Sequence, residues 1–165
     1  MDSDGARVFD RLTGIIDYPM FVVTTVAGGE TAGCLVGFTT QASLDPPRFL
    51  VCLSQANHTF RIARRAEHLA VHALGPAQHR LAALFGAATE DRHDKFVRCA
   101  WKPGPHGLPV LTEAPLWFAG PIIDRIRLGD HTGFLIDPQW GADHGAQAPV
   151  LSFRAVTDLD PGHPG

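Results

Sequence analysis

The chain has 165 residues, a usual size for one domain with its own hydrophobic core. Hydrophobic residues make up 45% and the formal net charge is −3, which argues against an electrostatic grip on nucleic acid or anionic lipid. The N-terminus lacks a basic start followed by an apolar stretch, and no apolar run is long enough to cross a bilayer. We therefore expect a cytoplasmic protein with no membrane and no nucleic-acid partner.

The first third of the chain predicts one short helix followed by β-strands. The helix is expected over 6–12, with Ser3 or Asp4 as its N-cap. Gly28-Gly29 predicts the tight turn of a hairpin, and Pro46-Pro47 interrupts the chain before another strand. The expected strands cover residues 20–26, 32–39 and 49–53.

A polar stretch, Thr39-Thr40-Gln41-Ala42-Ser43, separates two of these apolar strands. Such an interruption reduces the number of residues that can join the core. It is useful where the hydroxyls and backbone amides face a ligand. Taken alone, the stretch is explained more simply as the shaping of a turn, because turn chemistry needs no ligand. Both interpretations stay open on these residues alone.

The rest of the chain mixes short helices with strands. A helix is expected to begin at Asn57 or Thr59, both good caps, and a second helix is expected over 78–85, ended by Gly86. A further helical turn is expected over 91–97. Within the long strand 116–128, Gly120-Pro121 predicts a bulge or a bend. The other expected strands cover 68–74, 132–136 and 150–153.

Many strands with a few short helices favour a mainly β fold, an antiparallel barrel or sandwich with helices at its ends. No Gly-x-Gly-x-x-Gly follows a strand, and neither a P-loop nor Gly-x-Ser-x-Gly is present. A dinucleotide-binding Rossmann domain and hydrolase chemistry are therefore not supported. We expect one domain over residues 1–157 and a frayed tail over 158–165, which is rich in Asp, Pro and Gly.

The nine histidines and three cysteines do not form a recognisable metal or redox motif. His68 and His72 fall on one side of a predicted strand, without carboxylate or cysteine partners at ligand spacing, so we expect no metal. Cys34, Cys52 and Cys99 are an odd number outside any Cys-x-x-Cys context. They are interpreted as small, buried hydrophobic residues.

Several motifs, each weak alone, follow one another in a specific order. They are Gly33, the stretch Thr39 to Pro47, Ser54-x-x-Asn57-x-Thr59, Leu84-Phe85-Gly86, Asp94-Lys95-Phe96 and Gly129-Asp130-His131. Over roughly residues 10 to 153 this order resembles the flavin reductase-like, FMN-binding split-barrel family. That family includes reductase components of two-component flavin monooxygenases. The resemblance implies a six-stranded antiparallel split β-barrel that forms a homodimer, with the flavin near the dimer interface.

The resemblance also implies the activity: a flavin reductase in which NADH or NADPH passes a hydride to FMN, or alternatively FAD. A flavin-dependent monooxygenase is the implied partner. His131 and Asp130 match the catalytic residues, with the His near the nicotinamide. The residues that match the flavin-binding positions are Thr39, Thr40, Gln41, Ala42, Ser43, Ser54, Asn57, His58, Thr59, Phe85 and Gly86.

One segment departs from the family pattern. Many members have Thr-Ala-Asn where this chain has Leu35-Val36-Gly37. This departure leaves FMN versus FAD open. It also keeps an alternative, a non-catalytic FMN-binding or electron-carrier protein of the same fold. A third alternative is a flavin-dependent oxidoreductase of the same fold that acts on a specific organic substrate.

Overall fold

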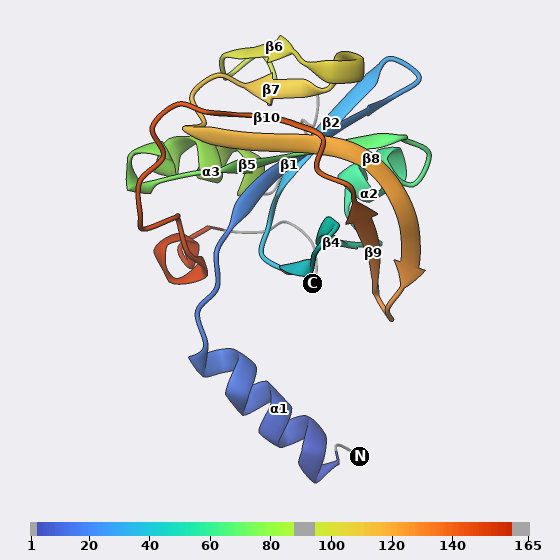
Figure 1. Cartoon of the computed structure of the whole chain (residues 1–165). Coiled ribbons are helices and arrows are strands. Elements are labelled where there is room, and N and C mark those ends of the chain that lie inside the picture. The colour runs from blue at the N-terminus through green and yellow to red at the C-terminus, as the bar shows by residue number, and fades with distance from the viewer. Residues whose placement is uncertain (1–2, 88–94, 160–165) are drawn as a thin grey trace.

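The computed structural model of the chain describes residues 3–87 and 95–159 (Figure 1). Its centre is one eight-stranded antiparallel sheet with the strand order β2-β1-β5-β8-β9-β4-β3, and β10 pairs with β8 outside this path. A separate two-stranded sheet is formed by β6 and β7. The strands are β1 (Phe21–Ala27), β2 (Glu30–Val36), β3 (Thr39–Leu44), β4 (Pro47–Ser54), β5 (His68–Ala73), β6 (Trp101–Pro103), β7 (Pro109–Leu111), β8 (Leu116–Arg127), β9 (His131–Ile136) and β10 (Trp140–Asp143).

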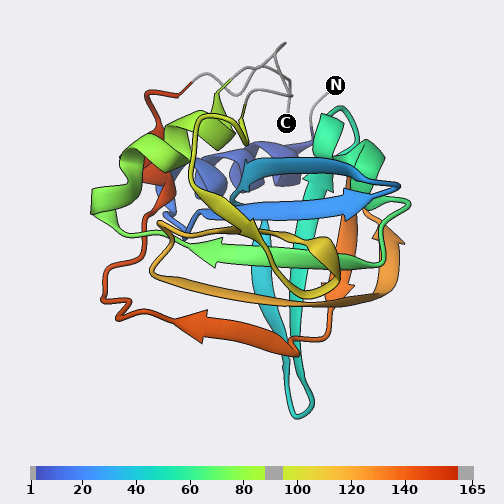
Figure 2. The ribbon, with the colours of Figure 1, turned by 90° about the horizontal axis from the view of Figure 1, so that it is seen from above.

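The long strand β8 makes the sheet fold over on itself. Its first half, Leu116 to Pro121, pairs with β5, and its second half pairs with β9 after a register shift between Ile122 and Asp124. In Figure 2 the β3–β4 hairpin runs across the direction of β1 and β5. Between the two halves lies a core cluster in which Val23 from β1 packs with Val51 from β4 and Phe134 from β9. The long strand with an irregularity is therefore confirmed, two residues beyond Gly120-Pro121.

The fold is mainly β with few short helices, as the sequence predicted, but the expected count of six strands in a split barrel is not confirmed. The sheet has eight strands, and β2 and β3 stand at the two ends of the strand order with no ladder between them in the described ranges. Gly37 and Phe38 connect β2 to β3. β10 then adds a strand that the sequence did not predict.

The predicted hairpin between β1 and β2 is confirmed. Gly28 and Gly29 have φ values of 57° and 77°, the left-handed backbone that two-residue hairpin turns require. Beyond β2, the polar stretch Thr39–Ser43 is neither the end of a strand nor a loop. It forms most of β3, an edge strand that pairs with β4 and is largely exposed. Polar side chains suit an edge strand because they face water instead of a core.

Three helices were expected, and all three are present. α1 (Asp4–Ile15) is capped by Ser3, whose Oγ accepts the Ala6 N–H at 3.1 Å. α2 (His58–Ala63) is capped by Asn57, and α3 (His79–Gly86) follows a 3₁₀ turn at Pro76–Gln78. The helical turn expected over 91–97 falls mainly on residues 88–94, outside the described part of the chain.

The C-terminal region corrects one further expectation. In place of a strand over 150–153 there is a single bridge between Pro19 and Ser152, and a 3₁₀ helix begins at Phe153. Leu159 packs against the core cluster that holds Phe85 and Val156, and only residues 158 and 159 of the expected tail are described. The short strands β6 and β7 also escaped the sequence analysis, because three residues carry too little alternation to be recognised.

α1 differs from α2 and α3 in having no buried residue. Figure 1 shows it standing away from the sheet at the end of an extended segment. Among the helices of the described ranges, none is sufficiently long and apolar to traverse a lipid bilayer.

Candidate functional site

A cavity of about 340 Å³ lies where β2, the end of β4 and the ends of two helices meet. Its walls come from β2 (Ala32 to Val36), the segment Gly37-Phe38, the end of β4 (Cys52 to Ser54), the start of α2 (Asn57 to Thr59) and the end of α3 (Phe85 and Gly86). Tyr18, Met20, Ala56, Arg61, Ala87, Lys95, His131 and Phe153 complete the lining. This volume falls in the range of small-molecule and cofactor sites.

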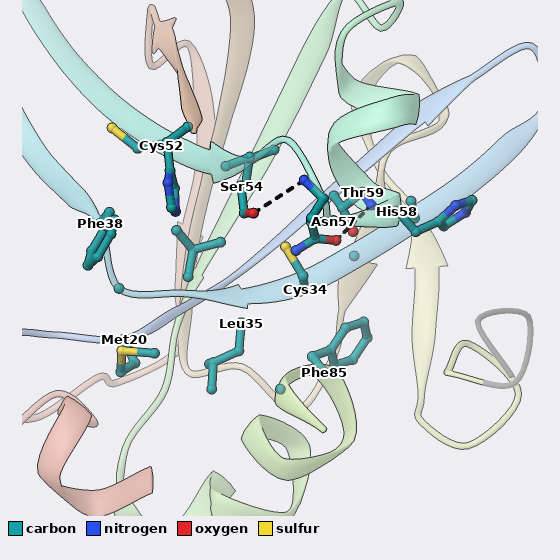
Figure 3. Close-up of a pocket in the computed structure, with 18 of the residues that line it drawn as sticks. Met20, Cys34, Leu35, Phe38, Cys52, Ser54, Asn57, His58, Thr59 and Phe85 are labelled. Carbon is teal, nitrogen blue, oxygen red and sulfur yellow. Dashed lines mark hydrogen bonds between the residues drawn. The ribbon is translucent and has the colours of Figure 1, made fainter. Parts of the chain in front are cut away.

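The turn from β4 into α2 brings four predicted residues together. Asn57 Oδ1 accepts the Thr59 N–H at 2.9 Å, and Ser54 Oγ accepts the Ala56 N–H at 3.3 Å (Figure 3). These bonds satisfy backbone donors at the start of a helix, and they fix side chains whose other faces line the cavity. Ser54, Asn57, His58 and Thr59 therefore lie in one wall, as the resemblance implied.

Close packing between β2 and α3 forms the facing wall. A Cβ on Gly33 would lie 2.8 Å from Phe85 Cε1, and a Cβ on Gly86 would lie 2.7 Å from Leu35 Cδ2. A side chain at either position would therefore force Phe85 or Leu35 to move. Phe85 and Gly86, both predicted site residues, are thus held directly against β2 and line the cavity.

His131 and Asp130 form a hydrogen-bonded pair at the start of β9. His131 Nδ1 lies 2.7 Å from Asp130 Oδ1, and the His131 side chain is 13% exposed whereas that of Asp130 is 88% exposed. A carboxylate only accepts, so the proton of the neutral ring is on Nδ1. The hydrogen bond from His131 holds the pKa of Asp130 below its ordinary value. His131 lines the cavity, and the ring of Phe38 lies 5.0 Å from its ring between centroids.

The five residues Thr39, Thr40, Gln41, Ala42 and Ser43 are not brought to this cavity. They lie on β3, outside the lining, and Phe38 takes the place at the cavity that the sequence analysis gave to them. Their predicted contact with a flavin stays a prediction. Asp130 also lies outside the lining and reaches the cavity only through His131.

The lining also contains residues that the sequence analysis did not select, above all Lys95 and Arg61. Lys95 stood within the motif Asp94-Lys95-Phe96, so a signal existed, but nothing in the sequence showed that it is buried. Four residues that are or can become cationic line the cavity, His58, Arg61, Lys95 and His131, and no Asp or Glu of the described chain does. In a protein of net charge −3, this composition favours an anionic ligand. No cluster of three or more His, Cys, Asp or Glu that could hold a metal occurs in residues 3–87 and 95–159.

Residues 13–155 match the family described as the flavin reductase like domain, and the chain belongs to this family. The stachydrine N-demethylase reductase subunit Stc3 of Rhizobium meliloti is 35% identical over 113 residues, 66% of this chain and 48% of that protein. The FMN reductase (NADH) RutF of Methylorubrum extorquens is 31% identical over 110 residues, 67% of this chain and 53% of that protein. The matched part thus spans about half the length of these curated relatives.

A solved structure supports the same assignment. The NADH:FAD oxidoreductase SgcE6 of Streptomyces globisporus C-1027 is 26% identical, with a TM-score of 0.79 over 93% of this chain and 91% of that one.

Proposed function

We propose that this protein is a flavin reductase that uses NADH or NADPH to reduce FMN, or alternatively FAD, in the cavity between β2, β4, α2 and α3. The observation that carries the proposal is the cavity of this flavin reductase family member, whose lining combines the hydroxyls of Ser54 and Thr59 with cationic groups and His131. The names of the relatives agree, since one is an FMN reductase (NADH) and another an NADH:FAD oxidoreductase.

The residues present fit a phosphorylated flavin. Ser54, Asn57, Thr59 and the cationic Arg61 supply donors of the kind that bind phosphate oxygens. Leu35, Val36 and Phe38 supply an apolar surface suited to a planar ring system. When bound, the flavin supplies the hydride-accepting chemistry. The protein's own contribution is to hold the two ring systems close and in line, which is a large source of rate acceleration.

His131 is proposed to orient the nicotinamide. Its Nδ1 proton is held by Asp130, so the ring keeps one orientation and one tautomer. A neutral imidazole held in this way can accept a hydrogen bond through Nε2 without moving a proton. We assign His131 this binding role and Asp130 the role of a positioning residue.

A second copy of the chain is proposed to complete the molecule. An isolated 12-residue helix is marginal in water, yet α1 buries none of its residues and exposes Val8, Phe9, Leu12 and Ile15 by half or more. Other apolar side chains are exposed as well, among them Leu44 at the end of β3, Ile126 near the end of β8 and Leu128 just after it. A homodimer in which α1 packs on the partner copy would cover these exposed apolar side chains. It would also explain why α1 lies away from the sheet of its own chain.

A flavin-dependent monooxygenase is the proposed recipient of the reduced flavin. The support is the name of one relative, which is the reductase subunit of a demethylase. The departure Leu35-Val36-Gly37 lines the cavity, and it favours the alternative of a non-catalytic FMN-binding protein as the second candidate.

One assay separates these two functions. The purified protein is mixed with FMN or FAD and with NADH or NADPH, and the absorbance of the reduced nicotinamide is followed. A flavin reductase consumes the nicotinamide catalytically with at least one donor. Flavin binding without consumption would leave only the electron-carrier function, and a protein that binds neither flavin would refute both.

A further inference from the structure

Lys95 is a buried cation in the wall of the cavity. The residue is 8% exposed, and its Nζ donates to Gly33 O at 3.2 Å and to Phe85 O at 3.1 Å. Phe85 lies in the last turn of α3, where helix carbonyls have no partner within the helix, and Gly33 lies on β2 at one end of the sheet order. Lys95 therefore fastens the end of α3 to β2 and satisfies two carbonyl groups.

These two bonds leave part of the ammonium group unused. An ammonium has three N–H donors, and no third acceptor and no carboxylate contacts Lys95 in the described part of the chain. The Phe85 ring, 5.7 Å from Nζ, adds only a weak cation–π contact. Burial lowers the pKa of Lys95, as expected for a cation without an anionic partner. A buried charge of this kind is costly unless an anion pairs with it.

The position of Lys95 relative to α2 indicates which part of a ligand it would meet. Burial raises the pKa of the Cys34 thiol, and hydrogen bonds with Thr59 and Asn57 and the charge of Lys95 oppose that rise. Cys34 thus lies within reach of all three residues, and all four line the same cavity. Lys95, Asn57 and Thr59 therefore lie around the same side chain, Cys34, in the lining of the cavity.

We propose that Lys95 binds the phosphate of the flavin and selects phosphorylated flavins over riboflavin. This inference rests on the proposed function. Two N–H groups of Lys95 hold the cavity wall, and the third donates to a phosphate oxygen. The phosphate neutralises the buried charge, while riboflavin, which carries only a hydroxyl at the same place, cannot do so.

The test compares flavin affinities of two lysine variants. Lys95→Gln removes the charge and keeps an amide that can donate to a carbonyl, and Lys102→Gln removes the same charge at the exposed position of the chain's other lysine. Dissociation constants for riboflavin, FMN and FAD are measured by fluorescence quenching. We expect Lys95→Gln to weaken FMN binding about 10- to 100-fold, as for a lost charged hydrogen bond, and riboflavin binding less than about threefold. Lys102→Gln should change neither.

Each other outcome has a defined meaning. If Lys95→Gln weakened the binding of FMN and of riboflavin equally, or weakened neither, phosphate binding by Lys95 would be refuted. Lys95 would then have only the structural role of joining α3 to β2. A change in the preference for NADPH over NADH, without a change in FMN affinity, would also refute it, because the phosphate would then belong to the nicotinamide donor. If the unmodified protein binds none of the flavins, the proposed function itself is refuted.

A measurement on the unmodified protein covers the case in which Lys95→Gln does not fold. The two lysines are reductively methylated and the rate at each is followed by mass spectrometry. FMN should slow the methylation of Lys95 at least about fivefold more than riboflavin does, because a phosphate holds the ammonium charged and covered. The exposed Lys102 should react equally with both flavins. Equal protection of Lys95 by the two flavins would overturn the proposal.

Discussion

Ser54 and His131 are direct partners in the antiparallel ladder between β4 and β9, and both line the cavity. One residue further along, the Gln55 N–H donates to Asp130 O at 2.9 Å, and Gln55 Nε2 donates to Gly129 O at 3.2 Å. The loop that carries Asp130 is thereby attached to the end of β4. Ser54 and His131, far apart in the sequence, are thus held opposite each other on neighbouring strands, so the proposed phosphate-binding and nicotinamide-binding residues keep a fixed separation.

Replacement of His131 should affect use of the nicotinamide more than binding of the flavin. In His131→Ala the ring that is proposed to orient the donor is lost, whereas Ser54, Asn57 and Thr59 remain in place. We expect kcat/KM for the reduced nicotinamide to fall about tenfold or more, for a lost buried hydrogen bond, and the FMN dissociation constant to change less than about threefold. Steady-state kinetics and fluorescence titration check the two quantities separately.

Asp130→Asn serves as the companion variant. An amide oxygen can still accept from His131 Nδ1, so we expect a smaller loss than in His131→Ala. The lowered pKa of Asp130 keeps the carboxylate ionised from about pH 5 to 8, so its own titration should not appear in the pH profile across that range. Equal loss of flavin binding and nicotinamide use in His131→Ala would show that the role assigned to His131 is wrong.

His72 should make the stability of the protein depend on pH. It is fully buried on β5, its Nδ1 lies 3.0 Å from Val22 O, and its Nε2 accepts the Leu111 N–H at 3.1 Å. Burial lowers the pKa of His72 to about 4, below the ordinary value near 6.5. The unfolded chain therefore binds more protons between these two values, and the stabilisation that is complete above about pH 6.5 is lost as the pH falls toward 4. From about pH 7 to about pH 5 we expect the free energy of unfolding to drop by about 2 kcal/mol from this residue.

Urea denaturation at the two pH values measures this drop. His72→Gln does not titrate, so its free energy of unfolding should change less between them than that of the wild type, although the variant is less stable at both. His144→Gln, at an exposed position, should keep the wild-type dependence. Parallel changes in the wild type and in His72→Gln would exclude His72 as the cause.

Gly33→Ala should disturb the wall between β2 and α3. The added Cβ would meet Phe85 Cε1 at 2.8 Å and Thr24 Cγ2 at 3.2 Å, so the Phe85 ring has to move. We expect a loss of about 1–3 kcal/mol in the free energy of unfolding, together with weaker flavin binding. Gly14→Ala is the control, because no atom lies within 4 Å of its added Cβ. Denaturation curves of Gly33→Ala and Gly14→Ala that coincide would contradict the close packing.

The exposed face of α1 should be needed for dimerisation. Phe9 and Leu12 are 63% and 50% exposed in the single chain. The double substitution Phe9→Ser and Leu12→Ser removes apolar surface, about 1.5–3 kcal/mol for each large side chain that a partner would bury fully. We expect the wild type to elute with twice the mass of the chain in size-exclusion chromatography with light scattering, and the variant to shift toward the single-chain mass.

Arg11→Ser, an exposed polar position on the same helix, is the matched control and should not alter the mass. A wild type with the mass of one chain at micromolar concentration would refute the proposed homodimer.

Local patterns in the sequence predicted much of this protein correctly. Glycine pairs mark a turn because only glycine adopts its backbone without strain, and the Gly28-Gly29 hairpin appeared where expected. Asn57 was recognised as a helix cap from its short polar side chain, and α2 begins next to it. The motifs Ser54-x-x-Asn57-x-Thr59 and Leu84-Phe85-Gly86 reached the same cavity because each lies next to the end of a strand or helix that the sequence also marks.

Tertiary structure decided what depends on contacts between distant segments. The polar stretch Thr39–Ser43 has one local pattern that fits a turn, a ligand loop or an edge strand, and only its pairing with β4 made it a strand outside the cavity. The sequence by itself thus determined the class of fold, the family and several residues that line the cavity. Burial of Lys95 against Gly33 and Phe85 follows from the packing of α3 on β2, and residues 33, 85 and 95 carry no common periodicity. The charge inside the cavity was therefore set by tertiary packing, because burial is a property of the assembled chain and not of any segment.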